Sequence, residues 1–334
     1  MKENRRKVVS VKGLRSGFNT RYGYVPAVDD VSFELYEGES VALVGESGSG
    51  KSVTALSLMR LLDPINSEEK ADELLLDGID ILSLSEKELC SVRGSKAAMI
   101  FQEPMTSLNP LHKVGDQITE ALLLHTNMTK QQAKNRAIEL IREVGIADEE
   151  RRANCYPHEI SGGMRQRIMI AMALSCNPQL LIADEPTTAL DVTVQAQILD
   201  LVNKLQKERN MALLIITHNL GVVAEIADRV MIMYAGQIVE SCEADILFEH
   251  PFHPYAHGLL KAVPTSDTAD EDLYIIEGSV PSPLFYPKGC RFAPRCQYAT
   301  DKCHKVAPIL KEVLPGHLVR CWNPLSDRRG KLIW

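Results

Sequence analysis

The sequence predicts an α/β protein in which buried strands alternate with helices. Short apolar runs have the length of fully buried strands, helical patterns lie between them, and a glycine-rich loop follows the first run. The runs lie at residues 41–44, 97–101, 180–183, 213–217 and 230–234. Strands that alternate with helices need crossover connections, so we expect an α/β sheet.

Two of the helices are placed by their own signals. Thr129 and Gln132 form a capping box, and the apolar stripe that follows them stops at Gly145. A second apolar stripe runs from Val194 to Leu205 at helical spacing. Both patterns predict helices that bury one face.

The chain divides into a long first part and a shorter C-terminal part. Its 334 residues suggest two domains, at roughly 150 residues each. Residues from about 104 to 178 show helical patterns without an obvious strand and predict a helical subdomain. After Pro254 the pattern loosens and prolines become frequent. We therefore expect one domain at 1–260 and an irregular, cysteine-containing module at 261–334.

Composition excludes several classes of protein. Hydrophobic residues make up 45% of the chain and charged residues 24%, which is typical of a globular protein and not of a disordered one. The chain has no apolar run of about 18 residues and no secretion signal at its start, so we expect an intracellular protein without membrane spans of its own. The net charge of −7 argues against a nucleic-acid partner.

The strongest motif is a phosphate-binding P-loop directly after the run at 41–44. Its residues are Gly45, Glu46, Ser47, Gly48, Ser49, Gly50, Lys51 and Ser52. Glycines let the backbone curl so that its N–H groups face phosphate oxygens at the start of a helix. We expect Lys51 to contact the phosphates and the Ser52 hydroxyl to ligate Mg²⁺.

Two carboxylates follow another buried run. Asp184 and Glu185 come directly after residues 180–183. A carboxylate at the end of such a strand is suited to hold Mg²⁺, and the next residue can polarise the attacking water. In a chain with a P-loop, this pair predicts ATP hydrolysis.

Three further elements indicate which class of P-loop ATPase this is. Ser161, Gly162 and Gly163 open a predicted helix, whose N–H groups and dipole form a second anion site. Gln102 and His218 each follow a predicted strand, so both should lie at the same sheet edge as Asp184.

Together these residues resemble the nucleotide-binding subunits of ABC transporters. The motifs stand in the family's usual order over about residues 8–250 and comprise the P-loop, Gln102, the run at 161–163, residues 180–185, the Ala-Leu-Asp run at 189–191, and His218. The resemblance implies a P-loop ABC-type ATPase with a mostly parallel sheet, an antiparallel β subdomain and a helical subdomain. It also implies that ATP and Mg²⁺ are the cofactors.

The family implies a role for each residue. Its members form head-to-tail dimers in which each ATP lies between one subunit's P-loop and the partner's Ser-Gly-Gly helix. In that arrangement Glu185 is the general base, and His218 contacts the γ-phosphate. Gln102 senses the Mg²⁺ held by Ser52 and Asp184 and couples to the permease, and Asp191 lies in the loop that crosses the dimer interface.

Two details differ or stay open. The family's commonest helix motif is Leu-Ser-Gly-Gly-Gln, whereas this chain has Ile160 and Met164 at the ends of the motif, so a side-chain contact from the final Gln would be lost. The adenine is expected to stack on an aromatic ring ahead of the P-loop. Tyr22 has a suitable distance to Gly45, while Phe18 fits the local pattern or simply packs in a strand.

A finer resemblance extends over nearly the whole chain. The runs at 161–167, 253–260 and 289–296 look like those of the oligopeptide/dipeptide-importer ATPases. That family implies a translocase at the cytoplasmic face of the membrane that drives uptake of short peptides. Its partners would be two permease subunits, an extracytoplasmic solute-binding protein and a second ATPase subunit, which leaves homo- and heterodimers open. Importers of nickel or other small solutes share part of the pattern.

Four of the eight cysteines crowd into the tail. Cys290, Cys296, Cys303 and Cys321 have the spacing C-x5-C-x6-C-x17-C, without the C-x2-C pairs typical of structural zinc. Relatives in the importer family are thought to carry a 4Fe-4S cluster in this region, so we expect one here, with zinc or reduced cysteines as alternatives. Five basic residues and one acidic residue between 288 and 305 should help to compensate thiolate charge.

Two other functions agree less well with the sequence. A soluble ABC-type ATPase acting on DNA or ribosomes would be expected to have a long coiled coil, tandem ATPase domains or a basic face, and none is evident in the sequence. A regulatory module that uses the nucleotide as a switch would not need a base such as Glu185. An ATP-driven import subunit accounts best for the motifs.

Overall fold

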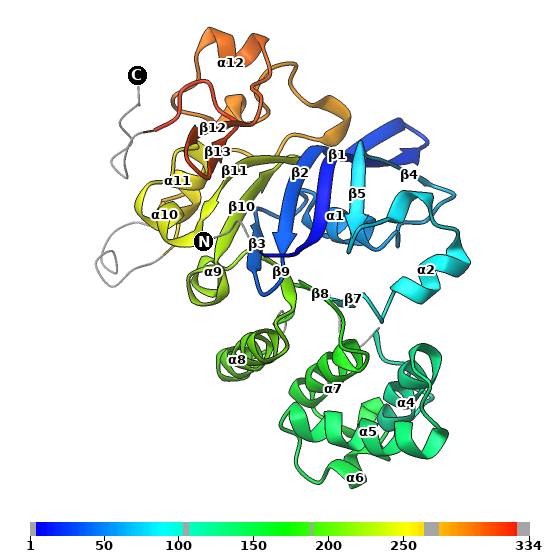
Figure 1. Ribbon diagram of the computed structural model, residues 1–334. Coiled ribbons are helices and arrows are strands. Elements are labelled where there is room, and N and C mark those ends of the chain that lie inside the picture. The colour runs from blue at the N-terminus through cyan, green and yellow to red at the C-terminus, as the bar shows by residue number, and fades with distance from the viewer. Residues whose placement is uncertain (1–4, 103–106, 188–189, 264–273, 326–334) are drawn as a thin grey trace. The chain divides into compact units, whose positions relative to one another are not determined.

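The computed structural model describes residues 5–102, 107–187, 190–263 and 274–325 (Figure 1). Pro104 and Ala189, which stand in predicted features, lie outside these residues. The chain forms two compact units, each assembled from segments far apart in the sequence. Unit 1 combines Met1–Ser10, Glu34–Glu39 and Leu74–Ile216, and unit 2 combines Val11–Phe33, Ser40–Glu73 and Thr217–Trp334. The expected boundary at residue 260 stays a prediction.

Three parallel strands form the centre of unit 1. They are β7 (Ala97–Ile100), β8 (Leu180–Asp184) and β9 (Ala212–Thr217), with β8 in the middle. Nearly all their side chains are buried, as expected for strands covered on both faces. Ile100 stands opposite Ala183, and Asp184 opposite Ile216, so the carboxyl ends of the three strands meet at one edge. The three predicted strands are confirmed.

Helices make up the rest of unit 1 after β7. They are α4 (Val114–His125), α5 (Lys130–Glu143), α6 (Glu149–Ala153), η2 (Pro157–Glu159), α7 (Gly162–Leu174) and α8 (Val192–Arg209). Figure 1 shows α4 to α7 gathered in one cluster. The predicted capping box is present: Thr129 Oγ1 accepts from Gln132 N, and Gln132 Oε1 accepts from Thr129 N. Among the described residues from 107 to 178, every regular element is helical.

The remaining elements of unit 1 are short and come before β7. They are β5 (Glu73–Leu76), β6 (Ile79–Asp80), η1 (Ile81–Ser83) and α2 (Glu86–Val92). β5 and β6 pair in the antiparallel sense.

Unit 2 is built on the sheet that carries the P-loop. β3 (Ser40–Val44) runs parallel to β10 (Arg229–Tyr234), and β10 turns back into the antiparallel β11 (Gln237–Glu243). Val44 stands opposite Ile232, so the P-loop begins beside the end of β10. Both strands were predicted, whereas β11 was not.

A second, antiparallel group of strands also lies largely in unit 2. β1 (Lys7–Thr20) pairs with β2 (Gly23–Tyr36) and, in the antiparallel sense, with β4 (Ser67–Lys70). This group agrees with the β subdomain that the resemblance implied. The longer helices of unit 2 are α1 (Lys51–Leu58), α9 (Leu220–Ile226), α10 (Ala244–Glu249) and α11 (Pro254–Lys261).

The C-terminal segment is less irregular than predicted. It contains η4 (Pro283–Phe285), η5 (Ala293–Arg295), α12 (Asp301–Lys305), β12 (Lys311–Leu314) and β13 (His317–Val319). β12 and β13 form a hairpin, and β13 pairs with β11 so that Glu240 stands opposite Val319. Both strands are too short to show a hydrophobic period, which is why the pattern did not reveal them. No helix in the described part of the chain is long and apolar enough to cross a membrane.

Candidate functional site

The P-loop connects β3 to α1 through two residues in left-handed conformation. Gly48 has φ 77° and Gly50 has φ 103°. A Cβ atom on Gly50 would stand 2.4 Å from the carbonyl oxygen of Ala27, so both the conformation and the space require glycine there.

Lys51 folds back over the start of the same loop. Its Nζ donates to the carbonyl oxygens of Gly45 at 2.8 Å and Glu46 at 3.0 Å, and the residue is 6% exposed. Its ammonium group therefore lies beside the backbone that precedes α1. The lysine, the helix N-terminus and the glycine turns have the chemistry of a phosphate site.

His218 shares a cavity with the start of the P-loop. The cavity measures about 240 Å³, and its wall includes Val44, Gly45, Glu46 and His218. His218 stands just after β9, as predicted, and this cavity lies wholly within unit 2.

Unit 1 brings together Gln102 and Glu185. Gln102 Nε2 donates to Glu185 Oε2 at 3.0 Å, because the two residues follow the neighbouring strands β7 and β8. Glu185 has a φ of 46°, which is uncommon for a residue with a side chain. Asp184, the last residue of β8, is 5% exposed. Gln102 and Glu185 therefore meet where β7 and β8 end. A shared edge for His218 and Asp184 stays a prediction.

The predicted second anion site is the N-terminus of α7. Ser161 caps this helix by accepting from Met164 N at 3.4 Å. A Cβ atom on Gly163 would lie 3.0 Å from Val194 Cγ1, so this glycine permits close packing against α8. Asp191 caps α8 by accepting from Val194 N at 2.9 Å.

The aromatic residues ahead of the P-loop occupy different surroundings. Tyr22 lies in the turn between β1 and β2, where it is 70% exposed beside Arg21. Phe18 is half-buried in β1, opposite Ser67 of β4, which agrees with its packing in a strand. Stacking of adenine on Tyr22 stays a prediction.

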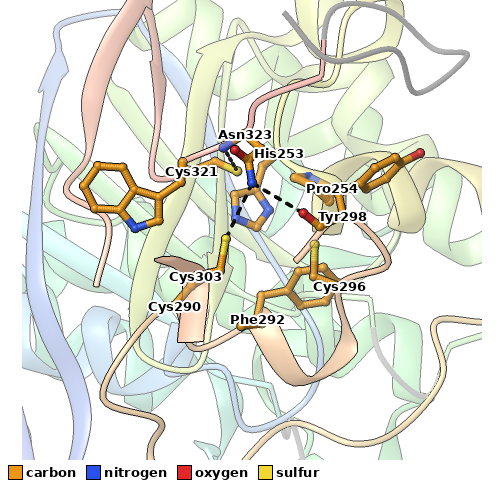
Figure 2. A pocket seen from close by; sticks show the side chains of 11 residues that line it. His253, Pro254, Cys290, Phe292, Cys296, Tyr298, Cys303, Cys321 and Asn323 are labelled. Carbon is orange, nitrogen blue, oxygen red and sulfur yellow. Dashed lines mark hydrogen bonds between the residues drawn. The ribbon is translucent and has the colours of Figure 1, made fainter. Parts of the chain in front are cut away.

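The four tail cysteines line one pocket of unit 2 (Figure 2). Cys290, Cys296, Cys303 and Cys321 share its wall with His253, Phe292 and other residues. Donors lie close to two of the sulfurs: Asn323 N stands 3.3 Å from Cys321 Sγ, and Asn323 Nδ2 stands 3.6 Å from Cys303 Sγ. Such N–H···S contacts stabilise thiolates bound to a metal.

Burial keeps several of these thiols protonated when no metal is bound. Burial raises the pKa of Cys296 to about 11 and that of Cys321 to about 12, and it also raises the pKa of Cys290. Two of the five basic residues near the cysteines have partners elsewhere, because Arg291 pairs with Asp29 and Arg295 with Glu46, and compensation of thiolate charge stays a prediction.

The spacing of the sulfurs bears on what the pocket can hold. Among the described residues, only Glu240, Cys242 and His317 bring three candidate ligand atoms within 4.8 Å of one another. No three tail sulfurs are therefore that close, whereas a single zinc ion holds its sulfurs about 3.8 Å apart, given Zn–S bonds of ~2.3 Å. The donor set, four thiols with neighbouring N–H groups, has the chemistry of a thiolate-bound metal centre.

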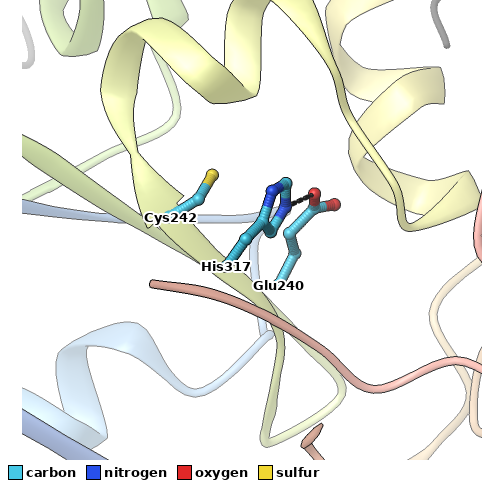
Figure 3. Close-up of side chains that lie close together, drawn as sticks. All are labelled: Glu240, Cys242 and His317. Atoms are coloured by element: carbon cyan, nitrogen blue, oxygen red, sulfur yellow. Dashed lines mark hydrogen bonds and ion pairs between the residues drawn. The ribbon is translucent and has the colours of Figure 1, made fainter. Parts of the chain in front are cut away.

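Glu240 and His317 form a buried pair that sequence reasoning missed (Figure 3). His317 Nε2 lies 2.6 Å from Glu240 Oε1, and the same carboxylate accepts the backbone N–H groups of Phe252 and His253 at 2.8 and 2.7 Å. The carboxylate is thus engaged by three protein donors, with Cys242 nearby. We interpret this cluster as a structural link between β11 and β13 rather than a metal site.

An ion pair between the P-loop and the tail was also missed. Arg295 contacts both carboxylate oxygens of Glu46, at 3.1 and 3.0 Å. Part of the pair stands in a recognised motif, because Arg295 lies inside the run at 289–296 that carries the resemblance to the importer ATPases. Nothing in the sequence indicated its partner.

Two family models match the chain. The model described as "ABC transporter" matches residues 28–188, and the model described as "Oligopeptide/dipeptide transporter, C-terminal region" matches residues 239–303. The second match includes three of the four tail cysteines.

Curated proteins and solved structures agree with these matches. The chain is 51% identical to the oligopeptide transport ATP-binding protein AppD of Bacillus subtilis, over 94% of this chain and 96% of that protein. It is 49% identical to the oligopeptide transport ATP-binding protein OppD of Escherichia coli, over 96% and 94%. The dimeric bacterial ABC transporter cassette MJ0796 is similar in structure, with a TM-score of 0.63, 28% identity, and coverage of 71% of this chain and 98% of that one.

Proposed function

The chain belongs to the ATP-binding subunits of ABC transporters, in the oligopeptide/dipeptide group, and from this membership we propose that it hydrolyses ATP to power the import of short peptides. One combined observation carries the proposal. The chain has a complete P-loop, and it is about half identical, over nearly their full length, to proteins named as oligopeptide transport ATP-binding proteins. No observation favours nickel or another solute over peptides.

The chemistry assigned to each residue follows from its type and position. Lys51 and the loop from Gly45 to Ser52 bind the β- and γ-phosphates. Asp184 and the Ser52 hydroxyl hold Mg²⁺, whose charge offsets the charge that develops on the phosphates.

A second group of residues acts on the attacking water and the γ-phosphate. Glu185 orients and deprotonates the water, Gln102 holds Glu185 and senses the metal, and His218 contacts the γ-phosphate. Ser161, Gly162 and Gly163 bind the ATP of a partner subunit, with Asp191 beside the dimer interface, and Tyr22 stacks on adenine.

The assembly is proposed from the same relatives. MJ0796, a cassette of similar structure, is dimeric, and we propose that this chain works as one of a pair of ATPase subunits, with a related chain as its partner. The pair docks on two permease subunits at the cytoplasmic face of the membrane, and a solute-binding protein delivers the peptide from outside.

We further propose that the four-cysteine pocket holds a 4Fe-4S cluster. Cys290, Cys296, Cys303 and Cys321 are its ligands, supported by the four-thiol donor set that lines one pocket and by the N–H groups beside two of the sulfurs. Bound there, such a cluster would supply a redox-active centre and would link Cys290 to Cys321. Anaerobic purification followed by iron, zinc and acid-labile sulfide analysis tests this: zinc without iron or sulfide refutes it.

Uptake of a labelled short peptide by the native host tests the main proposal. Lys51→Ala should abolish uptake, because the ammonium group supplies charge-assisted bonds to the phosphates. Lys87→Ala removes an exposed lysine of α2 and serves as the matched control. Normal peptide uptake with Lys51→Ala would contradict the proposal, as would loss of another solute's uptake with peptide uptake intact.

A further inference from the structure

The segment from Cys290 to Cys296 carries two kinds of side chain. Cys290 and Cys296 line the cysteine pocket, whereas Arg291 and Arg295, which stand next to them, reach other partners. All of these contacts lie within unit 2. One short segment therefore touches both the pocket and the region of the P-loop.

Arg295 is held in place by acceptors on several sides. Its side chain is 6% exposed, its Nε donates to Glu277 O at 3.0 Å, and its Nη2 donates to Ile276 O at 3.1 Å. Its Nη1 contacts both carboxylate oxygens of Glu46 and lies 3.4 Å from the hydroxyl of Tyr234. A guanidinium fixed on several sides defines the position of the carboxylate that it binds.

Glu46, the partner of the Arg295 guanidinium, is the second residue of the P-loop. Its backbone N–H donates to the hydroxyl of Tyr255 at 2.9 Å, and its carbonyl accepts from Lys51. A carboxylate at the start of a phosphate-binding loop opposes the anion that the loop must bind, and it can compete for the lysine. Arg295 removes both problems by pairing with it.

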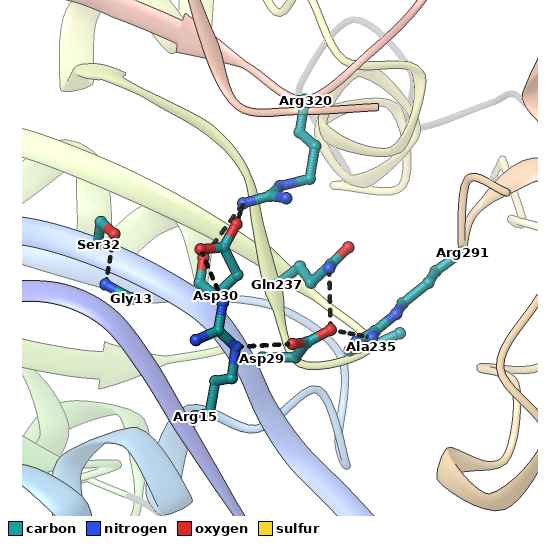
Figure 4. A network of polar contacts seen from close by, with 9 residues as sticks. All are labelled: Gly13, Arg15, Asp29, Asp30, Ser32, Ala235, Gln237, Arg291 and Arg320. Carbon is teal, nitrogen blue, oxygen red and sulfur yellow. Dashed lines mark hydrogen bonds and ion pairs between the residues drawn. The ribbon is translucent and has the colours of Figure 1, made fainter. Parts of the chain in front are cut away.

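Arg291 supports the other end of the loop indirectly, through its contacts with Ala235 and Asp29, which Figure 4 shows. It donates to the carbonyl of Ala235 and pairs with Asp29. The next residue in that turn, Gly236, donates its N–H to Ser49 O at 2.8 Å. The two arginines therefore brace the P-loop at Glu46 and at Ser49.

We propose that Arg295 is a positioning residue for the P-loop: it neutralises and fixes Glu46, so that the segment carrying two of the pocket cysteines sets the nucleotide affinity of the loop. This inference rests on the proposed binding of ATP at the loop. The C-terminal segment would then contribute to nucleotide binding through the Arg295–Glu46 ion pair.

A double-mutant cycle on the full-length chain tests the proposal, with the affinity for Mg²⁺-ATP measured by calorimetry. Arg295→Gln should weaken binding roughly tenfold, because it leaves the Glu46 carboxylate unpaired near the phosphates. Adding Glu46→Gln to Arg295→Gln should recover most of this loss, since the opposing charge is gone. Lys305→Ala, which removes an exposed positive charge from the same tail, is the control and should not change the affinity.

Several outcomes overturn the inference. An affinity for Mg²⁺-ATP that is unchanged in Arg295→Gln overturns it. A loss of affinity that Glu46→Gln fails to recover also overturns it, because a merely structural role for Arg295 would give the same loss whether position 46 is Glu or Gln. Urea unfolding of each variant shows whether the fold is kept. If the wild-type chain does not bind ATP, or Lys51→Ala binds it equally well, the proposed function itself fails, which is a different result from failure of the Arg295 variant alone.

Discussion

Gln102 donates a hydrogen bond to Glu185 across the ends of two neighbouring parallel strands, with 3.0 Å between Nε2 and Oε2. Glu185 holds a left-handed backbone conformation, which costs a residue with a side chain on the order of 1–2 kcal/mol. Strain of this kind is found at functional sites, where surrounding contacts maintain it. The bond to Gln102 is one such contact, and it connects the residue proposed to sense the metal with the residue proposed as base.

Glu185→Gln should stop turnover while keeping nucleotide binding. The amide can still accept a hydrogen bond but cannot take a proton from water, and loss of a general base typically costs ~10²–10⁴ in rate. Phosphate release by the assembled transporter and ATP affinity by calorimetry are the two measurements. A normal rate of phosphate release would remove Glu185 from the role of base.

Gly163→Ala should leave the chain less stable than Gly162→Ala does, by roughly 1 kcal/mol. The added methyl group would stand 3.0 Å from Val194 Cγ1, closer than ordinary packing allows. Gly162→Ala is the matched control, because its Cβ would lie 3.9 Å from Leu190 and should cost little. Urea unfolding measures both variants, and adding Val194→Ala should restore stability to Gly163→Ala. Equal stabilities of the two glycine variants would contradict the packing argument.

The metal-free chain should lose folding stability as the pH rises above 9. Burial raises the pKa of Cys321 from 9.0 to about 12, so between these values the unfolded chain loses a proton that the folded chain keeps. The unfolded state then binds fewer protons, and stability falls by up to about 1.4 kcal/mol per pH unit for this thiol. Below pH 9 the contribution is fully present.

Unfolding by urea at pH 7 and at pH 10, under reducing conditions, measures this effect. Cys321→Ser removes the titrating group and should show a smaller loss between the two pH values. An identical pH dependence in both chains would mean that Cys321 is not protected from ionisation in the fold.

His317→Ala should destabilise the chain by about 3–5 kcal/mol, because it leaves the buried Glu240 carboxylate without its imidazole partner. His317→Gln keeps a donor and should cost less. The unfolding free energies of the two variants check the order, and a chain that tolerates alanine as well as glutamine would show that the pair contributes nothing.

The parts of the fold that could be predicted are those with local signals. The strand at 180–184 is a continuous apolar run, and the helix after Thr129 has both a cap and a stripe, so each is encoded within a few residues. β13 has only three residues and depends on its partner strand β11. The Glu240–His317 contact between the two strands joins residues 77 positions apart, so no local pattern reveals it. Among the site residues, the P-loop was readable because its motif is contiguous. The Glu46–Arg295 pair was not, because 249 positions separate its members.

The pairing of β13 with β11 has a consequence for any shortened form of this protein. β13 covers the hydrogen-bonding edge of β11, a strand whose residues are almost all buried. A chain cut near residue 260 would present that edge uncovered, as a row of open N–H and C=O groups flanked by apolar side chains. Such edges recruit strands from other molecules. We therefore expect the isolated first part to self-associate through β11, an edge that β13 covers in the full chain.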